Sequence, residues 1–96
     1  MNKNVVALYE CVKGKIMEEF GISEQLMFGS NDAECVQART VLVVELHQRG
    51  LSDKEIAECT HKLRRCSICQ IRNKYKSGNA PWTVKACLAH LKAVAL

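Results

Sequence analysis

Apolar residues recur every three or four positions along most of the chain, which is the spacing of one face of an α-helix. The clearest stripe predicts a helix from about residue 4 to residue 20. Its members are Val5, Tyr9, Val12, Ile16 and Phe20. No pair of segments shows the strict alternation of apolar and polar residues that half-buried strands need. We therefore expect an all-α fold, a compact bundle of about six helices.

Glycines and small polar residues mark where the first three helices begin and end. Gly21 fits the position after the first helix, and Ser23 fits the N-cap of a short second helix. A third, longer helix begins near Asn31 or Asp32 and ends at Gly50. Its broad apolar face makes it the expected central scaffold of the bundle. That face consists of Val36, Val43, Val44 and Leu46.

A short fourth helix and a basic fifth helix follow. Ser52 and Glu55 match a capping box at the start of the fourth helix, and the chain then turns at residues 60–62. The fifth helix is predicted from about Leu63 to Tyr75, with Ile68 and Ile71 toward the core. Its polar residues are expected to face outward: Arg64, Arg65, Ser67, Arg72 and Lys74.

Pro81 fits the first turn of a sixth helix, where its missing N–H is not needed. We expect the packing face of this helix to consist of Trp82, Leu88, Leu91 and Ala95. The same helix offers an alternative, a homodimer seam made by Trp82, Leu88, Leu91 and Val94. With 96 residues, the chain is expected to form a single domain, residues 1–96.

The apolar segments are short and the cysteines are scattered. No apolar run approaches the roughly 20 residues that span a bilayer. The first residues are polar and are soon followed by Glu10, so they do not resemble a secretory signal. We therefore expect no membrane contact and a cytoplasmic location. The six cysteines are then expected to be free thiols, mostly buried.

Charge is distributed unevenly along the chain, and this distribution is more informative than the net charge of +4. Residues 1–58 contain six basic and ten acidic residues, whereas residues 59–96 contain eight basic residues and no acidic residue. Such asymmetry is typical of a surface that faces a polyanion, although a solvated basic face is the plainer alternative.

The features of a helix-turn-helix lie between about Leu51 and Lys76, with the turn and the second helix in the basic half. In such a unit the first helix supports the second, whose first turn enters the major groove of duplex DNA. Arginine there can bond guanine, and serine can bond a base or a phosphate. The side chains expected to contact DNA are Arg39, Lys54, Lys62, Arg64, Arg65, Cys66, Ser67, Arg72, Lys74 and Lys76. Of these, Arg72, Lys74 and Lys76 are expected on the sugar-phosphate backbone.

Four segments, in order and at similar spacing, resemble the C-terminal DNA-binding domain of the bacterial replication initiator DnaA. They are residues 20–26 (FGISEQL), 37–42 (QARTVL), 50–57 (GLSDKEIA) and 71–75 (IRNKY). Ile68, just before the last segment, also matches the family. The resemblance covers almost the whole chain. It implies six helices with a helix-turn-helix, and sequence-specific binding to double-stranded DNA.

The chain departs from this family at the residues that read bases. Residues 61–68 (HKLRRCSI) stand where the family has GGRDHTTV, so Cys66 and Ser67 replace two threonines. This implies a different target sequence. The loop at residues 29–34 is neutral to acidic where the family's loop is basic. The chain also contains no GxxxxGK[ST] phosphate loop, so we expect no nucleotide cofactor and no enzymatic activity. A stand-alone regulator or a mobile-element protein fits these features.

Other chemistry has weaker support in the sequence. Cys66 and Cys69 form a CxxC pair, with Cys59 and His61 just before it, but no second pair stands at zinc-site spacing. We expect no metal. The carboxylates are expected on exposed helix faces, where acid-base catalysis is not supported. The serious alternative is a helical protein-interaction module whose basic half binds an acidic partner.

Overall fold

The computed structural model describes residues 3–78 and 81–93, and within these ranges the regular secondary structure consists of α-helices, without any strand. The all-α prediction is confirmed. The helices are α1 (Lys3–Phe20), α2 (Glu24–Gly29), α3 (Ala33–Gln48), α4 (Asp53–Thr60), α5 (Arg65–Lys76) and α6 (Trp82–Ala93). None of them is long and apolar enough to cross a membrane.

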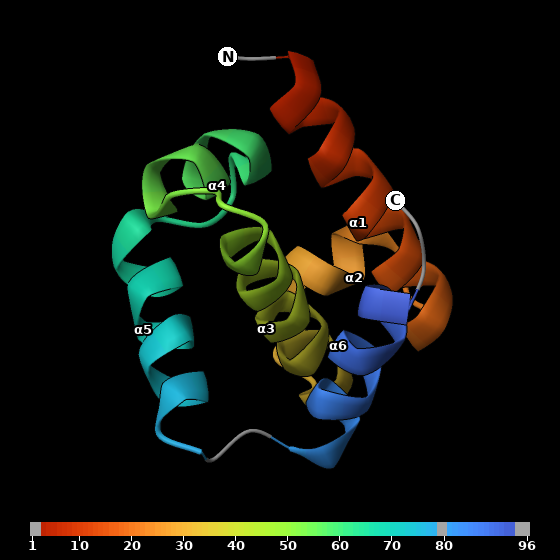
Figure 1. Cartoon of the computed structure of the whole chain (residues 1–96). Coiled ribbons are helices and arrows are strands. Elements are labelled where there is room, and N and C mark those ends of the chain that lie inside the picture. The colour runs from red at the N-terminus through yellow and green to blue at the C-terminus, as the bar shows by residue number, and fades with distance from the viewer. Residues whose placement is uncertain (1–2, 79–80, 94–96) are drawn as a thin grey trace.

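Helix α3 runs through the middle of the molecule and contacts each of the other five helices (Figure 1). Its residues from Val41 to Leu46 are all buried, so the helix has apolar contacts on every side at this level. Helices α1 and α6 lie on one side of it and α5 on the other (Figure 1). The expected role of this segment as central scaffold is confirmed, although Val36 near its start is 40% exposed.

Helix α1 packs on α3 through the stripe that its sequence predicts. Tyr9, Val12 and Ile16 are buried, and Val5 and Phe20 are partly buried against the same core. Lys13 is buried as well, and its charge is offset by two carboxylates, because its Nζ lies 3.1 Å from oxygens of both Glu10 and Glu24. This charged contact joins α1 to α2.

Helix α6 packs through a face that matches the expected one only in part: Leu88 and Leu91 are buried as predicted, but Trp82 is not. Val84, Cys87, Leu88 and Leu91 are buried against α1 and α3, whereas Trp82 is 78% exposed. The prediction that Trp82 packs in the core is wrong, because Trp82 lies on the opposite side of the helix from the buried Val84, two residues later. Leu88 and Leu91 belong to the chain's own core, so they are not available for the dimer seam considered above. Val94 and Ala95 lie outside the described residues.

One carboxylate contradicts the expectation that all acids lie on exposed faces. Glu45 in α3 is 2% exposed. Its Oε1 accepts a hydrogen bond of 2.7 Å from Arg49 Nε, one helical turn later, while Oε2 has no hydrogen-bond partner in the described part of the chain. The sequence conceals this burial because the i, i+4 pair looks like an ordinary surface pair.

Candidate nucleic-acid interface

The turn between α4 and α5 is held by a single buried hydroxyl. Thr60, the last residue of α4, is 4% exposed, and its Oγ1 donates to the carbonyl of Ala57 at 3.3 Å. The same oxygen accepts the backbone N–H of Leu63, also at 3.3 Å. His61 follows Thr60 in the left-handed region, with φ of 57°. These contacts fix the direction in which the chain leaves α4.

The predicted turn at residues 60–62 is confirmed, but α5 begins two residues later than expected. Its first helical residue is Arg65, and Arg64 occupies the N-cap position. Leu63 therefore belongs to the turn, where it packs partly buried against the core. The sequence predicted Leu63 to be helical because an apolar residue eight positions before Ile71 resembles a core position of the same helix.

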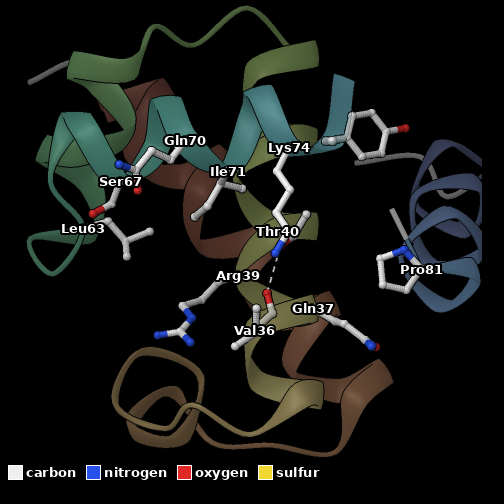
Figure 2. Close-up of a pocket in the computed structure, with 11 residues that line it drawn as sticks. Val36, Gln37, Arg39, Thr40, Leu63, Ser67, Gln70, Ile71, Lys74 and Pro81 are labelled. Atoms are coloured by element: carbon white, nitrogen blue, oxygen red, sulfur yellow. Dashed lines mark hydrogen bonds between the residues drawn. The ribbon is translucent and has the colours of Figure 1, made fainter. Parts of the chain in front are cut away.

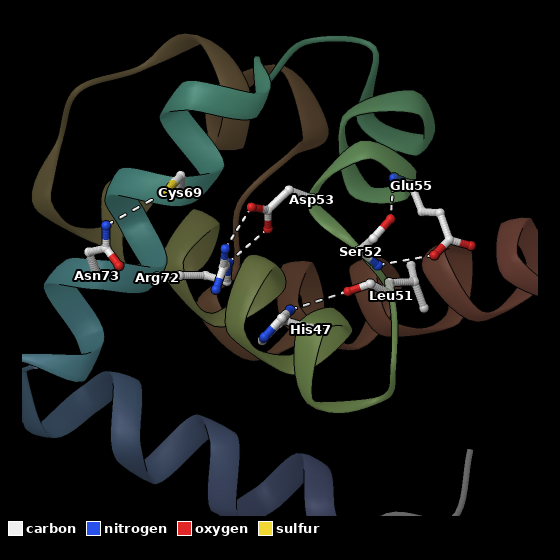
Figure 3. Close-up of polar contacts among 8 residues, drawn as sticks. All are labelled: His47, Leu51, Ser52, Asp53, Glu55, Cys69, Arg72 and Asn73. Atoms are coloured by element: carbon white, nitrogen blue, oxygen red, sulfur yellow. Dashed lines mark hydrogen bonds and ion pairs between the residues drawn. The ribbon is translucent and has the colours of Figure 1, made fainter.

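A bidentate ion pair braces α5 against α4 (Figure 3). Arg72 Nε and Nη2 donate to the two carboxylate oxygens of Asp53 at 2.7 and 2.6 Å. The hydrogen bonds from Arg72 hold the pKa of Asp53 below its usual value. Arg72 was expected to face outward onto the DNA backbone. Its guanidinium instead points across the helix pair, and we assign it to positioning α5.

The two helices of this pair begin in opposite ways. Helix α4 has a complete capping box, in which Ser52 and Glu55 bond each other's backbone N–H groups, and its first turn is acidic. Both features offset the positive end of the helix dipole. Helix α5 has no side-chain cap, no acidic residue in its first turn, and an exposed arginine at each of positions 64 and 65. Positive charge at this end disfavours the free helix and favours a bound anion.

A groove with a volume of about 440 Å³ runs between α3 and α5 (Figure 2). Arg39 of α3 and Lys74 of α5 both line it, together with Ser67 and Gln70. The Arg39 guanidinium donates a hydrogen bond of 2.9 Å to the carbonyl of Ser30. Lys74 extends from α5 toward α3 (Figure 2). The groove thus has one cation on each of its two walls.

The other predicted contact residues lie in the turn, on α5 and on α4. Lys62 in the turn is exposed, and its Nζ lies 5.8 Å from the centre of the Phe28 ring. Lys76 is exposed in the last turn of α5, and Cys66 is exposed in the first. Lys54 is exposed on α4. The structure therefore gathers Lys62, Arg64, Arg65, Cys66, Ser67, Lys74 and Lys76 along the turn and α5.

Two amides on α5 were missed among the candidate contacts. Ile68 is fully buried and Arg72 faces α4, so the opposite side of the helix presents Cys66, Gln70 and Asn73, all exposed. A residue advances about 100° around a helix, which places positions 66, 70 and 73 close together on one face. The same spacing is visible in the sequence, whereas the predicted contacts followed the positions of charged residues.

The cysteines do not form a metal site in the described ranges. No group of three or more His, Cys, Asp or Glu side chains there is arranged to hold an ion. Cys59 is buried and Cys69 partly buried, whereas Cys66 is exposed. Burial raises the pKa of Cys87 to about 11, and the charges of Glu19 and Glu45 act in the same direction. A thiol in that environment is a poor nucleophile at neutral pH.

Comparison with known proteins gives no relative. No protein-family model matches the sequence, and no curated protein or solved structure matches it either.

Proposed function

We propose that the chain is a double-stranded DNA-binding protein that uses α4 and α5 as a helix-turn-helix. The observation that carries the proposal is the surface of α5. Its N-terminus is exposed, uncapped and doubly cationic, and the whole helix contains no carboxylate. Such a helix end loses stability in the free protein and recovers it when a phosphate binds.

The contacts expected with DNA fall into two groups. Arg64 and Arg65 lie at the tip of α5, where they reach the bases or phosphates of the major groove first. Arg39, Lys62, Lys74 and Lys76 flank the helix and suit the phosphates on either side. Arg72 is the brace that keeps α5 at a fixed angle to α4.

We also propose that the chain is a relative of the DnaA DNA-binding domain, on the strength of the four similar segments. On this basis the protein is a non-catalytic regulator or a mobile-element protein that binds DNA in the cytoplasm. The differences at residues 63–67 predict that it binds a sequence other than the family's box.

Fluorescence anisotropy with a labelled random duplex tests DNA binding. We expect association at low salt, with log Kd rising linearly with log salt concentration because bound cations release counterions. Arg65→Ala with Lys74→Ala should reduce the salt slope by about 2, at roughly 1 per lost phosphate contact. The matched control is Lys15→Ala with Lys85→Ala, which removes equal charge from exposed positions on α1 and α6. Absence of association by the wild-type chain, or equal losses in both variants, would contradict the proposal.

A protein-interaction module is the second candidate, and one observation favours it. Trp82 is 78% exposed and lines a second pocket of about 350 Å³ to which α5 contributes no residue. Exposed tryptophan is typical of interaction surfaces. The carboxylates of Glu19 and Glu34 also line this pocket, so a basic peptide would suit it better than DNA. Trp82→Ala should leave DNA affinity unchanged if α5 is the nucleic-acid surface.

A further inference from the structure

The outer face of α5 carries the chemistry of base recognition in its two amides. Gln70 lies one turn after Cys66, and Asn73 lies almost one turn after Gln70. All three side chains are exposed, on the side of the helix opposite the buried Ile68. This is the face that a helix held by α4 presents to the floor of a major groove.

Neither amide is committed to a strong interaction within the protein. Gln70 makes no hydrogen bond with its side chain among the described residues, and it lines the rim of the groove between α3 and α5. Asn73 Nδ2 makes one weak contact, 3.6 Å to Cys69 Sγ (Figure 3). Their donors and acceptors are therefore available to a ligand.

A phosphate can use only the donors of an uncharged amide, whereas a base can use both its donors and its acceptor. A carboxamide offers one acceptor and two donors in a plane, which matches adenine N6–H and N7 in the major groove. Cations on either side of this face, Arg65 and Lys74, suit the backbone instead. Charge and hydrogen-bonding pattern therefore separate along the same helix.

We infer that Gln70 and Asn73 are specificity-determining residues that each bond an adenine in the major groove. The inference rests on the proposed function. Three residues of helix rise about 4.5 Å, and base pairs stack about 3.4 Å apart, so the two adenines lie about one to two base pairs apart. The target of this protein thus contains closely spaced A·T pairs, whatever the flanking arginines contact.

Selection of bound duplexes from a random pool, with the wild-type chain and with Gln70→Ala and Asn73→Ala, tests this inference. The wild-type chain should enrich two closely spaced adenines, and each variant should lose the preference at one of them. Each variant should bind the selected duplex about 5- to 150-fold more weakly. Affinity for random duplex should change less than about twofold, because phosphate contacts persist. Gln25→Ala, which removes an exposed amide from α2, is the matched control and should behave as wild type.

Replacing one selected adenine by 7-deazaadenine gives an independent readout without altering the protein. It removes the N7 acceptor and should weaken wild-type binding about fivefold, the value of one hydrogen bond. The variant that has lost the matching amide should show no further loss. If the variants enrich the same adenines as wild type, or if wild type binds duplex without enriching any sequence, the inference is overturned while the proposed function stands. If wild type binds no duplex, the proposed function itself fails.

Discussion

His61 is the one described residue other than glycine with a positive φ, and it sits where the chain leaves α4. A left-handed conformation costs an ordinary residue about 1–2 kcal/mol, and glycine avoids this cost. The strain is tolerated because Thr60 and Leu63 fix the turn on either side. The turn therefore depends on a residue that is not the most stable choice for its conformation.

We predict that His61→Gly raises the free energy of unfolding by up to about 1 kcal/mol, the gain in φ being partly offset by the flexibility of glycine in the unfolded chain. Lys62→Gly is the control, because Lys62 does not have a positive φ. It should leave stability unchanged or lower it. Chemical denaturation monitored by circular dichroism measures both, and a destabilised His61→Gly variant would contradict the assigned strain.

At the scale of single elements, α5 is the helix that departs most from the rules of helix stability. Arg64 occupies its N-cap without accepting a hydrogen bond, whereas Ser23 and Ser52 cap α2 and α4. Departures of this kind concentrate at functional sites.

We predict that Arg64→Asp stabilises the free protein by about 0.5–2 kcal/mol, because aspartate caps the first turn and offsets the helix dipole. The same substitution should weaken DNA binding at every salt concentration below about 0.2 M, since it replaces a cation by an anion. Thermal denaturation measures the change in stability, and fluorescence anisotropy on the same preparation measures the change in DNA affinity. Loss of stability together with loss of binding would instead mean that Arg64 supports the fold.

The brace between α4 and α5 gives a pH-dependent prediction. The pKa of Asp53 is lowered in the folded protein, so its contribution to stability is present above the unfolded value of about 3.9 and is lost as pH falls through the lower folded pKa. Asp53→Asn should therefore melt at a lower temperature than wild type at pH 7, and the difference should shrink below about pH 4.

The same substitution in an Arg72→Gln background should have a much smaller effect, because the ion pair is already absent. Parallel melting profiles of wild type and Asp53→Asn at all pH values would show that the pair does not stabilise the folded state.

At the scale of the whole molecule, local signals in the sequence were enough to predict where the helices lie along the chain. They were not enough to predict the contacts between helices. The apolar stripe of α1 and the capping box at Ser52 act within a few residues, and both are confirmed. The partner of Arg72 lies 19 residues away, and its identity depends on how α4 packs on α5. Trp82 carries the apolar character of a core residue, and only the position of α6 on α3 leaves it exposed.

The same limit applies to the candidate site. Charge asymmetry located it along the chain, and Arg64 and Arg65 are exposed as expected. The burial of Ile68 was predicted from the sequence, but the contact of Arg72 with Asp53, which also sets the outward side of α5, becomes known only in three dimensions. That orientation adds Gln70 and Asn73 to the site and assigns Arg72 to its support.

The most direct test of DNA binding through α5 is a map of backbone amide chemical shifts on addition of a duplex at low salt. If α5 is the DNA-binding helix, the shifts of Arg64 to Asn73 and of Arg39 should change, while those around Trp82 and the first two turns of α1 stay in place. Changes confined to the Trp82 pocket, or no changes on α5 at saturating duplex, would contradict it.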